Sequence, residues 1–134
     1  MPPRPKTILV VEDDIEIAAM LVSVLQDHGY RALSAQSGVE AVEVARKECP
    51  DLISLDLFLP GLTGQEALHL LKASEETAGI PVIAVSAFLE ILSPGDRSAL
   101  VALVPKPLEI DELLTAVERS IGRPARWPPA HHVD

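Results

Sequence analysis

The stretch from residue 7 to residue 30, TILVVEDDIEIAAMLVSVLQDHGY, contains the pattern that decides the fold. Its first five residues are apolar throughout and rich in β-branched side chains, which is typical of a strand buried on both faces of a sheet. Three adjacent carboxylates follow, Glu12, Asp13 and Asp14. Apolar residues then recur at helical spacing up to Gly29: Ile15, Ala18, Ala19, Val22 and Leu25. The stretch therefore predicts a strand, an acidic turn and a helix with one apolar stripe.

The rest of the chain repeats this alternation. Further apolar runs of strand length lie at 51–55, 80–85 and 100–104, and a weaker one starts at Tyr30 and is expected at a sheet edge. Helical periodicity covers 38–48, 64–74 and 110–121. The stretch 86–99 has room for only a short helix, with Ser93 as its cap and Pro94 at its first position. This order predicts an α/β fold, a doubly wound five-stranded parallel sheet with helices on both faces.

Composition narrows the possible functions. A chain of 134 residues is long enough for one core and too short for two ordinary domains. Acidic residues outnumber basic ones by 20 to 11, a formal charge of -9, so we expect no direct nucleic acid binding. The apolar runs are too short for membrane insertion, no apolar segment follows the N-terminal basic residues, and the single cysteine excludes an internal disulfide. These features favour a cytoplasmic protein.

Carboxylates gather where two of the expected strands end. In doubly wound sheets ligands bind at the carboxyl ends of the strands, where the winding direction reverses. If the strands take the order 2-1-3-4-5, that point lies between the first strand, which ends at Glu12, and the third, which ends at Asp56. Mutual repulsion would raise the pKa values of these acids unless a cation lies among them, and Mg²⁺ prefers oxygen ligands. A hydroxyl at Ser86 and an amine at Lys106 follow two further strands, a set that suits phosphoryl transfer to a carboxylate.

Four short motifs carry a resemblance to a known family. LVVEDD (9–14), LDLFLPG (55–61), AVSA (84–87) and VPKPL (104–108) occur in this order. Together they resemble the receiver domain of two-component response regulators, and the resemblance spans about residues 6–122. It implies the flavodoxin-like strand order 2-1-3-4-5. It also implies Mg²⁺ as cofactor, and a phosphoryl donor that is a sensor histidine kinase or a histidine phosphotransfer protein.

The resemblance assigns roles residue by residue. Asp56 is the expected phosphoacceptor, Ser86 the switch hydroxyl, and Lys106 the phosphate-binding cation, placed before a proline whose peptide bond is cis in this family. The implied metal ligands are Glu12 through a water molecule, Asp13, Asp56, and the backbone carbonyl of Phe58.

The sequence departs from the family pattern in the region expected to transmit the signal. Leu103 stands where most receivers have an aromatic switch residue, and the stretch from Ser86 to Lys106 is shorter than usual, so helix 4 should be short, displaced or irregular. Thr63 replaces an acid, a change expected to be minor. An apolar cluster could instead mark a contact with an unknown downstream protein: Phe88, Leu89, Ile91 and Leu92.

Other interpretations remain open. Asp13 with Glu16 fits a capping box, and Asp14 fits a helix cap or a supporting charge. A pseudo-receiver would keep the fold as an interaction module and never carry phosphate. A Mg²⁺-dependent phosphohydrolase of the haloacid dehalogenase type would need a second acid two residues after Asp56, where this chain has Phe58. We therefore expect no enzyme beyond self-catalysed phosphotransfer and slow autodephosphorylation.

The remaining residues give few functional signals. We expect a disordered N-terminus at 1–5, the receiver domain at 6–122, and a Pro-rich C-terminal tail at 123–134 that contains Trp127. Cys49 is interpreted as a packing residue. The histidines lack metal-ligand spacing and are assigned no site: His28, His69, His131 and His132. The expected assembly is a monomer or a weak dimer.

Overall fold

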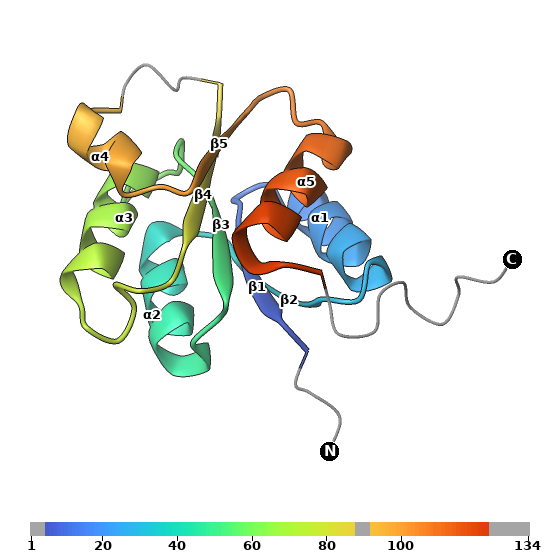
Figure 1. Cartoon of the computed structure of the whole chain (residues 1–134). Helices are drawn as coiled ribbons and strands as arrows, with labels where there is room; N and C mark the ends of the chain where they lie inside the picture. Colours follow the sequence, from blue (N-terminus) through green and yellow to red (C-terminus); the bar gives the residue numbers. More distant parts are fainter. Residues whose placement is uncertain (1–4, 88–91, 124–134) are drawn as a thin grey trace, which may run out of the picture.

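The computed structural model describes residues 5–87 and 92–123, and its centre is a parallel sheet of five strands (Figure 1). The strand order is β2-β1-β3-β4-β5, and every neighbouring pair is parallel. This confirms the predicted order and places the weak second strand at an edge. The strands are β1 Thr7–Val11, β2 Arg31–Ala35, β3 Leu52–Asp56, β4 Val82–Ser86 and β5 Ala102–Pro105.

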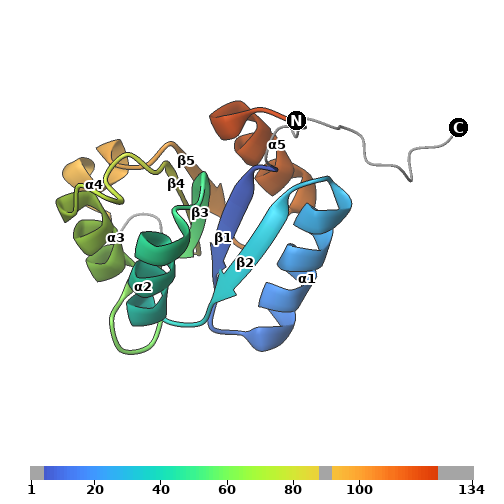
Figure 2. The ribbon, with the colours of Figure 1, turned by 90° about the horizontal axis from the view of Figure 1, so that it is seen from below.

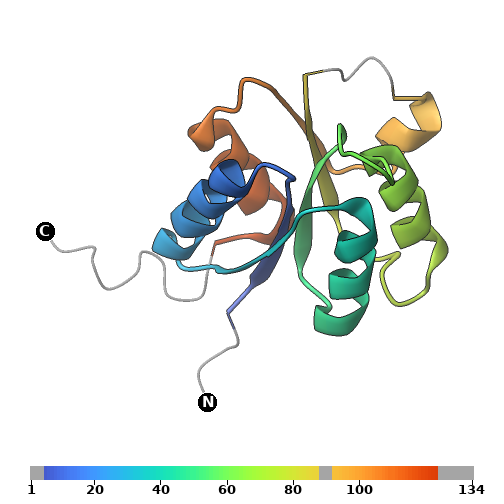
Figure 3. The ribbon, with the colours of Figure 1, turned by 180° about the vertical axis from the view of Figure 1, so that it is seen from behind.

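Helices cover both faces of the sheet, as predicted. They are α1 Ile15–Asp27, α2 Gly38–Glu48, α3 Gly64–Ala73, α4 Pro94–Ser98 and α5 Ile110–Ile121. Figures 2 and 3 show α1 and α5 on one face and α2 and α3 on the other, with α4 beside α3. Because every crossover brings the chain back to start a parallel strand, the carboxyl ends of all five strands lie at one edge of the sheet.

Alternate strand residues supply two separate cores. Leu9 and Ile53 face the layer of α2 and α3, whereas Ile8, Val10 and Ile83 face the layer of α1 and α5. Each of these side chains is essentially inaccessible to solvent. The central strands are buried on both faces, which explains why they are apolar throughout instead of alternating.

The buried stripe of α1 differs from the predicted one. The helix buries Ala18, Leu21 and Leu25, whereas Ala19 is exposed and Ile15 is 66% exposed. Ile15 is the first residue of the helix, directly after its cap. Helical periodicity finds an apolar face, but the packing of the helix against the sheet decides which residues are covered.

The short α4 confirms the prediction for the region before β5. The Ser93 hydroxyl accepts a hydrogen bond from the Asp96 N–H, and Pro94 occupies the first turn. Leu92, just before this helix, is buried in the core on the side of α2 and α3, so its predicted role in an exposed contact is wrong. The other members of that predicted cluster, Phe88, Leu89 and Ile91, lie outside the described residues, as does Trp127.

Cys49 is not a packing residue. It ends α2 in the left-handed conformation with φ 48°, and its side chain is exposed. The cysteine therefore terminates the helix at a position where glycine or asparagine is more usual. Within the described residues, none of the helices is long and apolar enough to cross a membrane.

Candidate functional site

The first and third strands bring the predicted acids together. Val11 of β1 is in register with Leu55 of β3, so the residues that end the two strands become neighbours. One carboxylate oxygen from each of Glu12, Asp13 and Asp56 lies within 4.8 Å of the others. Glu12 and Asp56 are buried and Asp13 is exposed. Such a cluster of oxygen donors, open to solvent on one side, fits a hard divalent cation such as Mg²⁺.

Glu12 is a buried carboxylate held from two directions. Its backbone N–H donates to the Ala35 carbonyl at 3.0 Å, and its Oε2 accepts from the Asp14 N–H at 3.1 Å. Burial raises the pKa of Glu12, and the nearby Asp56 carboxylate adds to the rise. The Asp14 hydrogen bond and the Lys106 charge act in the opposite direction without cancelling the effect. Keeping Glu12 ionised in this buried position therefore costs free energy, and a cation bound beside it would lower that cost.

Asp56 lies at the centre of the crevice and is only 3% exposed. Its Oδ1 accepts the Phe58 N–H at 2.9 Å, and its Oδ2 accepts from the Lys106 Nζ at 2.9 Å. These two contacts fix the carboxylate between a backbone donor and an ammonium group. The contact with Lys106 joins residues 50 positions apart in the sequence.

Lys106 enters the crevice from the loop after β5. Its backbone N–H donates to the Ser86 carbonyl at 3.1 Å, and the following Lys106–Pro107 peptide bond is cis. Its Nζ also lies 3.7 Å from the Glu12 Oε1. Burial alone would lower the pKa of Lys106, but the hydrogen bond to Asp56 and the neighbouring carboxylate charges outweigh it and raise the pKa. The lysine therefore carries its charge at neutral pH.

The structure separates the adjacent acids by role. Asp14, not Asp13, caps α1, because its Oδ1 accepts from the N–H groups of Glu16 and Ile17. The capping box between Asp13 and Glu16 is therefore wrong, since a box would require Asp13 at the cap position. The cap interpretation of Asp14 is confirmed. Asp13 is left with its carboxylate in the acidic cluster.

Ser86 and Leu103 lie on the two strands farthest from β2. Ser86 is the buried last residue of β4, at the same edge as Asp56, and its role as a switch stays a prediction. The metal role of the Phe58 carbonyl also stays a prediction. Leu103 is partly buried and packs against the core on the side of α2 and α3.

Sequence reasoning missed three features of the surroundings of Asp56. A Cβ on Gly64 would lie 2.5 Å from the Asp56 carbonyl oxygen and 2.4 Å from the Leu57 Cα, so α3 begins in contact with the acceptor strand. Thr63 and Glu66 form a capping box, which explains why a threonine serves there. A mostly apolar cavity of about 260 Å³ opens beside Asp56 and Lys106. The pattern T-G-Q-E could have revealed the capping box, whereas no sequence signal reveals the cavity.

Comparisons with known proteins agree with this geometry. The family model of the response regulator receiver domain matches residues 8–118. The polar-differentiation response regulator DivK of Brucella anthropi is 31% identical over 123 residues, covering 88% of this chain and 98% of the relative. DivK of Brucella ovis is 32% identical over 122 residues, covering 87% and 97%.

Solved structures give the same result. CheY4 of Vibrio cholerae, a chemotaxis protein, has a TM-score of 0.77 at 26% identity, covering 87% of this chain and 99% of that one. The receiver domain of the sensor histidine kinase PA1611 from Pseudomonas aeruginosa has a TM-score of 0.77 at 31% identity, covering 89% and 99%, and holds a magnesium ion in its active site cleft. The fold, the acidic crevice and the family match agree, and the chain belongs to the response regulator receiver domain family.

Proposed function

We propose that this receiver domain accepts a phosphoryl group on Asp56 from a sensor histidine kinase or a histidine phosphotransfer protein, and signals through protein contacts. The observation that carries the proposal is the position of the Asp56 Oδ2, 2.9 Å from the Lys106 Nζ in a crevice that also contains Glu12 and Asp13. A nucleophilic carboxylate, a fixed cation and clustered oxygen donors are the groups that phosphoryl transfer requires.

The transfer itself is a simple exchange of bonds. An Asp56 carboxylate oxygen attacks the phosphorus of a phosphohistidine, the phosphorus–nitrogen bond breaks, and its electron pair leaves with the imidazole nitrogen. The Phe58 N–H holds the other Asp56 oxygen in place. Lys106 pairs with the Asp56 carboxylate before transfer and with a phosphoryl oxygen afterwards, which keeps its positive charge compensated.

Glu12, Asp13, Asp56 and the Phe58 carbonyl would hold the Mg²⁺ ion of this family. When bound, the ion neutralises charge on the transferred group. Glu12 supports this assignment because its pKa is raised by burial and by the adjacent Asp56, the electrostatic condition that a bound cation relieves.

The surroundings of Asp56 also favour a signalling role over hydrolysis. The side chain two residues past Asp56 is Phe58, which is exposed and cannot act as a general base. The aspartyl phosphate should therefore be lost slowly. Phe58 and Ile15 expose apolar surface within three residues of the clustered acids in the sequence, and such surface suits contact with a protein donor. We place the protein in the cytoplasm and expect no nucleic acid partner.

Intact-mass spectrometry after incubation with acetyl phosphate tests the proposal. We expect one Mg²⁺-dependent phosphoryl adduct on the wild-type chain and none on Asp56→Asn. Asp27→Asn removes an exposed carboxylate from the end of α1 and should be labelled like the wild type.

Two other outcomes would replace the proposal. If no adduct forms where another receiver is labelled, the chain is a pseudo-receiver, an alternative favoured by Leu103 and the five-residue α4. Turnover of many equivalents of acetyl phosphate without an accumulated adduct would instead indicate a phosphohydrolase.

A further inference from the structure

The mostly apolar cavity of about 260 Å³ beside Asp56 lies between the sheet and α1. Its walls come from β1, α1, β3, β4 and the loop after β5. Three of its apolar wall residues, Val10, Leu21 and Val85, are each at most 5% exposed. Protein interiors contain few voids larger than a water molecule, so a cavity of this size is unusual. We call it the Ser54 cavity, after the polar residue in its apolar wall.

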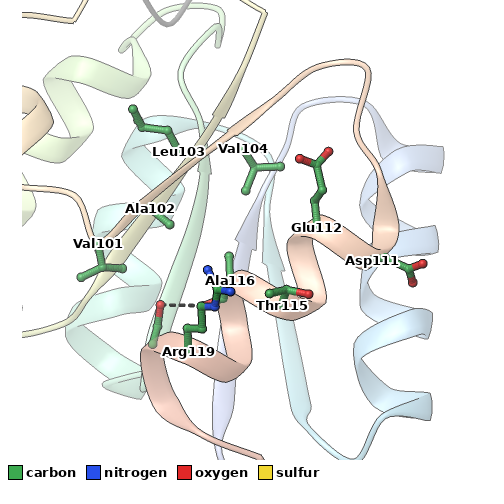
Figure 4. A pocket seen from close by; sticks show the side chains of 10 residues that line it. Val101, Ala102, Leu103, Val104, Asp111, Glu112, Thr115, Ala116 and Arg119 are labelled. Atoms are coloured by element: carbon green, nitrogen blue, oxygen red, sulfur yellow. Dashed lines mark hydrogen bonds between the residues drawn. The ribbon is translucent and has the colours of Figure 1, made fainter.

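A larger hollow of about 610 Å³, between β5 and α5, has a different character (Figure 4). Figure 4 shows apolar side chains on the β5 side and the charged side chains of Glu112 and Arg119 on α5. Val101, on the apolar side, is 53% exposed. Charged groups beside exposed apolar atoms are common on protein surfaces. The Ser54 cavity, with its buried apolar walls, is therefore the better candidate for a small-molecule site.

Ser54 is a polar residue in an apolar layer. It lies on β3 in register with Val10 of β1 and Ile83 of β4, which both belong to the core on the side of α1 and α5. Ser54 is 3% exposed. The described residues give its hydroxyl no hydrogen-bond partner, and the oxygen is not enclosed by protein but opens into the cavity. Because buried hydroxyls normally have a partner, the occupant of the cavity is the natural source of one.

We propose that the Ser54 cavity binds a small neutral molecule, an apolar group of about ten non-hydrogen atoms with one hydrogen-bonding substituent, such as an aromatic alcohol. The proposal goes beyond phosphoryl transfer and does not depend on it. An apolar cavity of about 150 Å³ holds one benzene molecule, so the Ser54 cavity has room for a ring with a short substituent. Apolar walls with a few placed polar groups are usual in small-molecule sites.

The charged groups at the polar end of the cavity favour a neutral ligand. The Lys106 Nζ lies 2.9 Å from the Asp56 Oδ2 and 3.7 Å from the Glu12 Oε1, so its charge is already compensated. An anionic ligand would meet the two carboxylates, and a cationic ligand would meet the ammonium group. Either charge would also lose hydration among the apolar walls. A neutral ligand avoids both costs, and the Ser54 hydroxyl can donate a hydrogen bond to it or accept one from it.

The side of the cavity nearest to solvent is formed by residues that are only partly covered. Ile17 is 36% exposed, Pro107 is exposed and Leu108 is half-buried. A ligand can therefore enter past these three side chains. Ser54 precedes Asp56 by two residues, about 7 Å along β3. A ring that is hydrogen-bonded to Ser54 would lie against the strand that carries the phosphoacceptor without needing a contact with its carboxylate.

Amide NMR of the full chain in a chelator tests the proposal, with benzyl alcohol as the probe. Benzylamine and benzoate are cationic and anionic analogues of similar size. We expect saturable shifts at the amides of Ser54, Leu21 and Val85, and a dissociation constant several-fold lower for benzyl alcohol than for either analogue. Tighter binding of a charged analogue would overturn the proposal, and so would shifts that do not saturate, since the cavity would then hold only water. No phosphodonor is present, so the result is independent of labelling at Asp56.

Matched variants locate the binding. Ile17→Phe extends a larger side chain into the cavity and should abolish saturable binding. Met20→Phe is the control, because Met20 is also exposed on α1, at 45%, but does not line the cavity. Ser54→Ala removes the hydroxyl and should weaken binding about fivefold. The NMR spectra check that each variant folds, and if Ile17→Phe does not, Ser54→Ala decides. Unchanged affinity in the folded cavity variants, or an equal loss in Met20→Phe, contradicts the proposal.

Discussion

Helices α3 and α4 begin in the same way and differ in what holds them. Each starts with a hydroxyl cap, Thr63 or Ser93, that accepts a backbone N–H three residues later. α3 continues for 10 residues and buries Gly64, Ala67, Leu68 and Leu71, whereas α4 stops after 5 residues with none buried. A cap starts a helix, but apolar burial sustains it. We therefore expect α3, which follows Asp56, to be held firmly by its buried residues, and α4, which follows Ser86, to be held weakly.

The largest effect is expected when a glycine in each helix is replaced by alanine. Gly64→Ala places a Cβ 2.4 Å from the Leu57 Cα, so backbone must move, and we expect a loss of about 3 kcal/mol in the free energy of unfolding. Gly95→Ala meets only the Ser93 hydroxyl at 3.8 Å and should gain about 0.5 kcal/mol from helix propensity. Urea unfolding measures both changes. Similar effects at the two positions would mean that α3 is no more tightly packed than α4.

Much of this contrast could be predicted from the sequence. The architecture could be predicted because strands buried on both faces appear in the sequence as apolar runs, and helices appear as apolar residues at helical spacing. The short α4 could be predicted because few residues separate Ser86 from the next apolar run. The acids met as predicted because parallel strands end at one edge of a sheet. The strand order itself came from the family resemblance.

The parts that failed depend on three-dimensional contacts. Ile15 is exposed at the first position of α1, and Leu92 is buried just before α4, so in both cases the fold and not the local pattern decides the burial. Asp13 and Asp14 are chemically identical, so only backbone geometry could decide which one caps α1. The close approach of Gly64 to the acceptor strand likewise has no local signal.

An effect of intermediate size is expected from the buried Glu12 carboxylate beside Asp56. In the metal-free protein, burial raises the pKa of Glu12 above its ordinary value of 4.5. The folded state then keeps a proton that the unfolded chain has released, so the contribution of Glu12 to the free energy of unfolding is full below 4.5 and falls as the pH rises through the raised pKa. Glu12→Gln should flatten this part of the profile.

Urea unfolding in a chelator, from acidic to neutral pH, measures the slope. Glu43→Gln is the matched control, because Glu43 is exposed on α2 and its replacement should leave the slope unchanged. Added Mg²⁺ should also reduce the slope of the wild type if Glu12 helps to hold the ion. If the free energy of unfolding changes equally with pH in the wild type and in Glu12→Gln, Glu12 is not the cause of the pH dependence.

The smallest effect concerns one contact between α3 and α4. His69 on α3 and Asp96 on α4 meet at 2.6 Å between Nε2 and Oδ1, and the histidine side chain is 66% exposed. The hydrogen bond from His69 lowers the pKa of Asp96, so this contribution is present above the ordinary value of 3.8 and is lost as the pH falls through the lowered pKa. Because the histidine is largely in solvent, the pair should contribute only about 0.5 kcal/mol to stability.

A double-mutant cycle with His69→Ala and Asp96→Ala measures this coupling, and amide hydrogen exchange locates it. The N–H groups of Ala99 and Leu100 donate within α4 and the turn that follows, so they should exchange faster in either variant. The Arg31–Glu48 pair, at 3.2 Å, provides a control because it joins β2 to α2, away from α4, and its removal should leave these amides unchanged. If the coupling is present but the α4 amides are unaffected, α4 is held by the residues that flank it in the core, Leu92, Ala99 and Leu100. The five-residue α4 would then be held more firmly than its length and exposure indicate.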